Sequence, residues 1–193
     1  MSDLKKRINT FIKKRDSNTH RYSSFDFCYE YFYYNKGNLT EDNLQQSCCQ
    51  LWSYLASWGM IVRGNELQGK SYASLKKVIG YINKHPEFYD VKLDDNDFVD
   101  KILKLYDGIE HALGLTMQKN KKTLITKIIL GVYACCPAFD SRFCRTFGTN
   151  PQGHLSKKKL QRIVDFYREN KSAIDGFCIR TLHFTPPQKI RVV

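Results

Sequence analysis

The chain has 193 residues, of which 42% are hydrophobic, 13% aromatic and 26% charged, and its formal net charge at pH 7 is +12. This length and aromatic content fit one folded domain with a sizeable core, and the scarcity of Gly (11) and Pro (5) excludes collagen-like and low-complexity chains. No apolar run approaches the ~20 residues that span a membrane, and residues 1–15 are too polar for a secretory signal, so we expect a cytoplasmic protein with no membrane partner.

Hydrophobic periodicity predicts helices throughout the N-terminal half. Ser23 and Asp26 have the spacing of a capping box for a helix that runs to about Tyr34, although the aromatic residues of this segment also alternate as in a strand. Thr40 opens a long apolar segment, and His85-Pro86 stops the helix that follows it. The ranges that we expect to be helical in this half are 4–12, 23–34, 40–61 and 71–82.

The C-terminal half continues the helical pattern. Gly114 ends one amphipathic segment, Pro137 ends a strongly apolar one, and Asp140 and Ser156 open the next two. The expected helices are 97–113, 123–135, a short segment after 140, and 156–167, with an extended tail from residue 175. The fold class is therefore all-α. We expect one compact helical domain over 1–193, or two helical lobes around a cleft that join near 86–95.

The charge is segregated along the chain. Residues 87–110 carry 3 basic and 8 acidic side chains, whereas residues 111–193 carry 15 and 4. A strongly basic C-terminal half beside an acidic segment indicates a directed electrostatic face. Such a face favours a polyanionic partner, and we expect that partner to be DNA.

The cysteines and histidines indicate neither disulfides nor a metal site. The number of cysteines is odd (7) and two pairs are adjacent, at positions 48–49 and 135–136, which is typical of reduced thiols. The histidines are scattered, and no Cys or His pair has the spacing of a zinc site. We therefore expect no metal and no cofactor.

The segment from residue 120 to residue 147 carries the strongest chemical signal. A basic turn with Lys121 and Lys122 enters an apolar helix, which stops at Pro137, and Asp140 begins the next helix. Backbone amides at the start of a helix among lysines suit a phosphate group. Two plainer interpretations stay open, since Asp140 could only cap a helix and Lys122 could be a solvated surface lysine.

This order of residues resembles the helix-hairpin-helix DNA glycosylase superfamily over about residues 116–147. Lys122-Thr123 matches the end of the family's hairpin, and Asp140-Ser141, followed by Arg145, matches the start of its next helix. In place of the hairpin's two glycines flanking an apolar residue, the chain has Gln118, Lys119 and Asn120.

The resemblance implies a monomeric enzyme that flips a damaged or modified base out of DNA and excises it, in repair or in defence. Asp140 would stabilise the sugar cation or activate water, and Lys122 would contact the DNA or act as a Schiff-base nucleophile with lyase activity. We expect the hydrolytic route. The resemblance points to DNA contacts from Lys119, Asn120, Lys121, Thr123, Arg142 and Arg145, and we take the walls of the base pocket to include Trp52, Trp58 and Phe139.

Two other function classes fit the same sequence. A non-enzymatic helical nucleic-acid-binding protein or regulator would use the basic charge equally well. A protein-interaction module would use exposed aromatic residues instead. The position of Asp140 separates the first of these from the enzyme, because an exposed cap favours a binding protein and a buried carboxylate that faces a basic groove favours catalysis.

Overall fold

Eight α-helices make up most of the part of the chain that the structure describes. This computed structural model describes residues 2–17, 19–62, 64–115, 121–150, 153–177, 179–180 and 189–190. The α-helices are α1 (Ser2–Arg15), α2 (Ser23–Tyr34), α3 (Glu41–Ser57), α4 (Lys76–Lys84), α5 (Phe98–Leu113), α6 (Lys121–Tyr133), α7 (Ser141–Thr146) and α8 (Lys157–Asp175). Two 3-10 helices, η1 (Tyr72–Leu75) and η2 (Pro86–Asp90), and a pair of two-residue strands, β1 (Ile179–Arg180) and β2 (Lys189–Ile190), complete them. The all-α fold class is confirmed.

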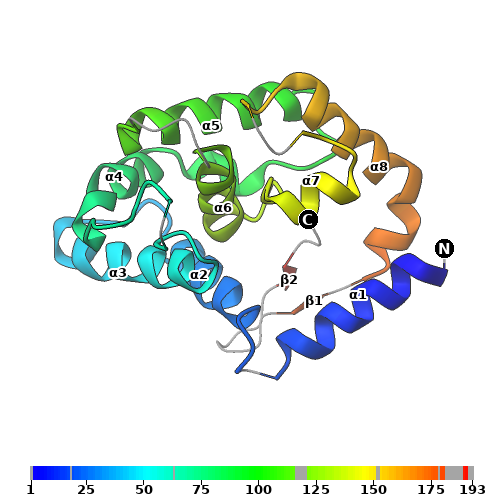
Figure 1. Cartoon of the computed structure of the whole chain (residues 1–193), viewed down its shortest axis with the longest axis horizontal. Helices are drawn as coiled ribbons and strands as arrows, with labels where there is room; N and C mark the ends of the chain where they lie inside the picture. Colours follow the sequence, from blue (N-terminus) through cyan, green and yellow to red (C-terminus); the bar gives the residue numbers. More distant parts are fainter. Residues whose placement is uncertain are drawn as a thin grey trace.

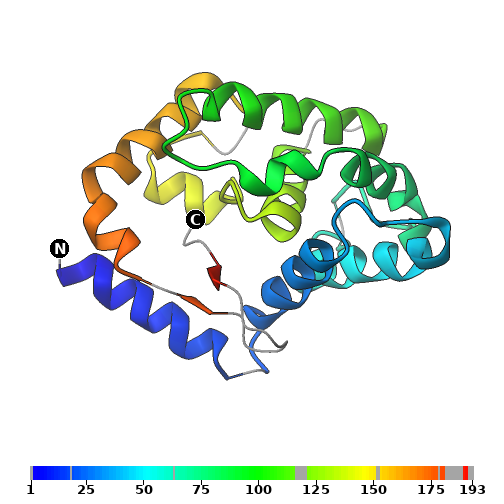
Figure 2. The same cartoon turned by 180° about the vertical axis from the view of Figure 1, so that it is seen from behind.

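Helix α6 occupies the middle of the body (Figures 1 and 2), where it packs against α2, α3 and α5. Its apolar residues surround the helix axis, and Ile125, Ile128, Ile129 and Val132 have no exposed surface. A helix that is apolar on all sides is stable only when other helices enclose it. None of the helices in the described ranges has the length and apolarity needed to cross a membrane.

One hydrophobic cluster runs through the described domain. It includes residues on both sides of the predicted 86–95 junction, and Phe88 and Tyr89 of η2 belong to it. The Tyr89 hydroxyl donates a hydrogen bond to the carbonyl of Phe32 at 3.0 Å, and its ring lies 4.7 Å from that of Tyr133. The connection between the two halves of the chain is thus part of a single compact core.

The expected end of one helix and the expected start of another are confirmed by their caps. Gly114 follows α5 in the left-handed conformation, at φ 56°, which costs glycine little. The Ser156 hydroxyl accepts the backbone N–H of Lys159 at the start of α8. The predicted 40–61 helix is shorter than expected and ends at Ser57, and the predicted 71–82 helix divides into η1 and α4.

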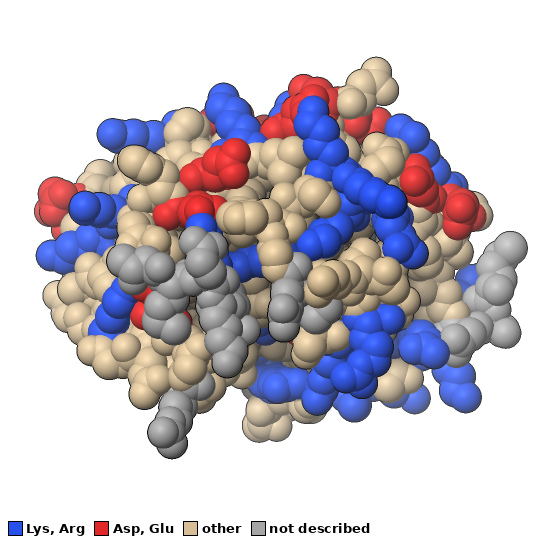
Figure 3. Space-filling view, turned by 45° about the horizontal axis from the view of Figure 1, so that its top comes forward, with Lys and Arg blue, Asp and Glu red and all other residues tan. Residues whose placement is uncertain are grey.

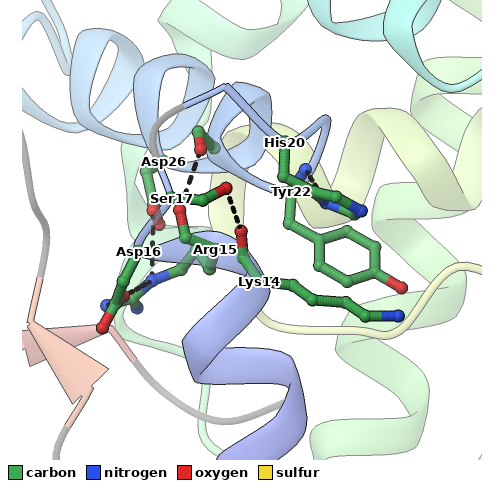
Figure 4. A network of polar contacts seen from close by, with 8 residues as sticks. Lys14, Arg15, Asp16, Ser17, His20, Tyr22 and Asp26 are labelled. Atoms are coloured by element: carbon green, nitrogen blue, oxygen red, sulfur yellow. Dashed lines mark hydrogen bonds and ion pairs between the residues drawn. The ribbon is translucent and has the colours of Figure 1, made fainter.

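The capping box predicted at Ser23 and Asp26 is wrong, although the helix itself forms and the strand alternative is excluded. The Ser23 hydroxyl donates to the carbonyl of Arg15, at 3.0 Å, instead of capping α2. Asp26 is fully buried, and its Oδ2 lies 3.5 Å from Arg15 Nε. Figure 4 shows these contacts, which attach the end of α1 to the start of α2.

Candidate functional site

The loop between α6 and α7 folds back onto the first turns of α6. The Thr123 hydroxyl donates to the carbonyl of Phe139 at 3.1 Å, and the Thr126 hydroxyl accepts the N–H of Phe139 at 2.9 Å. Ala134 ends α6 with a positive φ of 51°. These contacts hold both backbone polar groups of Phe139, so the next residue, Asp140, lies close to α6.

Asp140 uses its two carboxylate oxygens differently. Oδ1 accepts the backbone N–H of Phe143 at 2.9 Å, so the interpretation of Asp140 as the N-cap of α7 is confirmed. Oδ2 lies 3.8 Å from Nζ of Lys127, and the Asp140 side chain is 32% exposed. One oxygen therefore caps a helix while the other faces a charged neighbour and solvent.

Lys127 is a nearly buried lysine in the middle of α6, with a side chain only 5% exposed. Burial lowers the pKa of its amine, the Asp140 carboxylate opposes this shift, and the charge of Arg21 adds to it. Its Nζ lies 4.7 Å from the centre of the Trp58 ring. The amine is thus held between a carboxylate and an aromatic face.

Trp58, which directly follows α3, has aromatic and cationic neighbours. The Tyr22 ring stacks on it, with 5.6 Å between centroids and 17° between planes. The guanidinium carbon of Arg21 lies 5.1 Å from the ring centre. We call Arg21, Tyr22, Trp58 and Lys127 the Trp58 cluster.

The Trp58 cluster and Asp140 line a cavity of about 1130 Å³. Residues of α1, the α1–α2 turn, the segment after α3, α5, α6, α7 and the segment before α8 form its wall. The charged lysines, arginines and carboxylates among those described are Arg21, Lys121, Lys122, Lys127, Asp140 and Arg142. Among these described residues, five cations surround one carboxylate. The cavity thus favours an anionic or acceptor-rich ligand.

Lys121 and Lys122 are both nearly buried, so the interpretation of Lys122 as a solvated surface lysine is wrong. Lys121 forms an ion pair with Glu110 of α5. The Lys122 amine donates to the carbonyl of Asn150 at 2.9 Å, and burial together with the nearby Lys159 lowers its pKa to about 8. A lysine with this pKa carries a neutral amine in part of the molecules near neutral pH.

The structure brings six of the predicted site residues to this cavity, namely Lys121, Lys122, Thr123, Asp140, Arg142 and Trp58. Trp52 does not line it, because it lies within α3 and packs against the core, whereas Trp58 follows the end of that helix. Phe139 is fully buried and packs on Phe143 at 5.0 Å, since successive side chains of an extended loop point to opposite sides. Arg145 is exposed on α7 outside the cavity wall, and Lys119 and Asn120 lie outside the described residues.

The sequence interpretation missed Lys127, Arg21 and Tyr22. A signal for Lys127 exists, because it is the lone charged residue within the apolar run 124–132, and a buried lysine requires a carboxylate or hydrogen-bond partner. Arg21 and Tyr22 come from a turn without periodic pattern, and the packing of α2 against α3 brings them to Trp58.

The acidic segment 87–110 partly neutralises α8. Lys157 pairs with Asp100 and Lys171 with Asp94, each at 2.7 Å. Other lysines and arginines stay on the surface, and Figure 3 shows blue side chains gathered over the lower and right parts of one face.

Comparison of the chain with protein-family models, with curated proteins and with solved structures finds no match in any of the three.

Proposed function

We propose that the protein is a DNA glycosylase-like enzyme, which takes a damaged or modified base out of the DNA stack and hydrolyses its bond to the sugar. The observation that carries the proposal is the divided role of Asp140: Oδ1 caps α7, and Oδ2 faces a cavity lined by cations. The resemblance of residues 116–147 to the helix-hairpin-helix glycosylases assigns the catalytic role to the same residue. The proposed enzyme acts as a monomer without a cofactor.

The chemistry follows from the charge that develops on the sugar. As the bond between C1′ and the base nitrogen breaks, its electron pair leaves with the base and the sugar becomes an oxocarbenium cation. Oδ2 of Asp140 stabilises this cation and orients the water that adds to C1′. The carboxylate accepts the proton that this water loses, and the departing base takes up a proton from solvent. Because Oδ1 is fixed by the N–H of Phe143, the carboxylate is already oriented before substrate binds.

The cations of the cavity and its rim would bind the DNA backbone. Arg142 is exposed beside Asp140, and Arg145 lies one turn further along α7. Phosphate contacts of this kind give affinity without base recognition. Thr123 uses its hydroxyl to hold the carbonyl of Phe139, so we assign it to positioning the loop rather than to DNA contact.

Lys122 offers a second route. With a pKa of about 8, roughly a tenth of its amines are neutral at pH 7, and a neutral amine can attack C1′ to form a Schiff base. Because the Lys122 amine already donates a hydrogen bond to the backbone carbonyl of Asn150, we take hydrolysis as the main route. Borohydride reduction during turnover decides this point, since a covalent protein–DNA adduct that is absent in Lys122→Gln would establish the lyase route.

The decisive experiment compares the wild-type protein with Asp140→Asn. Both are incubated with oligonucleotides that carry a panel of damaged and modified bases, and abasic sites are detected by alkaline cleavage. Because Asn is as good an N-cap as Asp, the variant should fold and bind DNA within about threefold of wild type. We expect its base release to fall by ~10²-fold or more. Equal activity of the two proteins would refute the catalytic role.

A non-enzymatic nucleic-acid-binding protein is the second candidate, because the capping bond of Asp140 alone accounts for an aspartate at this position. This candidate predicts salt-sensitive DNA binding and no base release from any member of the panel.

A further inference from the structure

The groups around Asp140 restrict the kind of base that the cavity can accept, an inference that rests on the proposed function. Arg21 and Lys127 both lie within 5.1 Å of the centre of the Trp58 ring. Tyr22 stacks on the same ring. An aromatic ring attracts a cation through its negative faces, and two protein cations already lie close to the Trp58 ring.

The charged groups of the cavity are equally one-sided. Ammonium and guanidinium groups donate hydrogen bonds and accept none. In the described part of the wall, all charged groups except Asp140 are ammonium or guanidinium groups. One of the two carboxylate oxygens of Asp140 already accepts the N–H of Phe143. A base that enters would therefore meet many donors and few charged acceptors.

We propose that the cavity selects neutral or anionic bases with carbonyl oxygens along the recognised edge, as in oxidised or deaminated bases, and rejects the cationic bases that ring alkylation produces. Carbonyl oxygens accept hydrogen bonds from the amine of Lys127 and the guanidinium of Arg21. A base with a fixed positive charge would lie beside these two cations, with only one carboxylate to offset them.

Lys127 is the main selecting residue. Its amine is the cation that lies closest to the Trp58 ring, and it is also the ion-pair partner of Asp140. Lys127→Met keeps an unbranched side chain of similar length and removes the charge. Arg142→Met removes a cation of the same cavity for which no contact with Trp58 is found. As a proposed phosphate contact it should weaken binding to both members of a pair alike, so it serves as the control for the preference and not for the affinity.

The test measures binding separately from catalysis. DNA duplexes carry one 2′-fluoro-arabino nucleotide, whose sugar resists base loss because fluorine disfavours the oxocarbenium cation. Two pairs of bases are compared, each matched in ring system: 8-oxoguanine against cationic 7-methylguanine, and uracil against cationic 3-methylcytosine. Fluorescence anisotropy at one fixed salt concentration gives the dissociation constants.

We expect the wild-type protein to bind the neutral member of each pair at least tenfold more tightly. The preference should fall below threefold in Lys127→Met and remain in Arg142→Met. If Lys127→Met does not fold, Arg21→Met removes the second cation at an exposed position and should also reduce the preference. Equal binding of the two members, or tighter binding of the cation, overturns the inference.

The same bases on ordinary deoxyribose distinguish this inference from the proposed function. Preferential binding of the neutral base without any base release refutes the glycosylase proposal and leaves the selectivity of the cavity established. Base release together with equal or tighter binding of the cationic bases refutes the selectivity and leaves the glycosylase proposal standing.

Discussion

The amine of Lys127 lies 3.8 Å from Oδ2 of Asp140, and this pair links the middle of α6 to the N-cap of α7. At 3.8 Å the contact is an ion pair that is too long for a good hydrogen bond. Oδ2 therefore remains available to a water molecule or a sugar. The arrangement depends on the α6–α7 loop, which Thr123 and Thr126 hold through Phe139.

The first prediction concerns the cap of α7. Asp140→Ala should lower the free energy of unfolding by about 1 kcal/mol, because the N–H of Phe143 loses its acceptor. Asp140→Asn should keep the cap, since its side-chain oxygen can accept the same hydrogen bond, and any remaining loss measures the ion pair with Lys127. Urea denaturation of the three proteins measures the difference. An Asn variant as unstable as the Ala variant would mean that the charge, and not the cap, stabilises this region.

The second prediction concerns the contact between α3 and α6. A Cβ atom added at Gly131 would lie 2.8 Å from Cδ1 of the buried Tyr54 ring. Gly131→Ala should therefore destabilise the protein by about 1–3 kcal/mol, as overpacked cores do. The matched control is Gly80→Ala on α4, where an added Cβ meets nothing within 4 Å and Ala should stabilise the helix by up to about 1 kcal/mol. Melting temperatures that shift in the same direction for both variants would contradict this packing.

The local features of the fold follow from sequence, because they depend on neighbours along the chain. Gly114 and Ser156 end and begin helices where expected, and the periodicity of 123–135 identifies the buried helix. Asp140 is predictable as a cap, since it follows the loop that Pro137 begins, and its catalytic role stays a prediction. These positions need no knowledge of which helices touch.

The tertiary features could not be predicted in the same way. Ser23 and Asp26 have the spacing of a capping box, but the contact with Arg15 turns both side chains toward α1. Phe139 is aromatic and adjacent to Asp140, yet the loop directs it into the core. The Trp58 cluster joins residues from three separate elements, and no spacing in the sequence relates Arg21 to Lys127.

The third prediction concerns DNA affinity. Lys121 and Lys122 are nearly buried, so charge reversal there would disturb the fold as well as binding. Arg142 and Arg145 are exposed and offer cleaner tests. If each contacts one phosphate, its replacement by Gln should weaken binding to all sequences alike and reduce the slope of log K against log salt by about 0.9 on duplex DNA. If the slope is unchanged in the variant that carries both Arg142→Gln and Arg145→Gln, DNA does not contact α7.

The last prediction concerns the buried carboxyl of Asp26. Burial raises its pKa to about 7, the nearby Arg15 lowers it, and the carboxylates of Glu30 and Asp16 raise it further. In the unfolded chain the pKa is near 3.8, so between about pH 4 and pH 7 the folded protein holds a proton that the unfolded chain has lost. Stability must then fall as the pH rises, by up to ~1.4 kcal/mol per pH unit, and the contribution is fully present only below pH 4. Asp26→Asn cannot lose this proton, so its stability relative to wild type should increase from pH 4.5 to pH 7 and level off above. Urea denaturation across this range measures the difference, with Asp165→Asn on the exposed side of α8 as the control that should run parallel to wild type. If the plots of unfolding free energy against pH run parallel for Asp26→Asn and wild type, the Asp26 carboxyl is ionised throughout this range and Arg15 is a sufficient counter-charge.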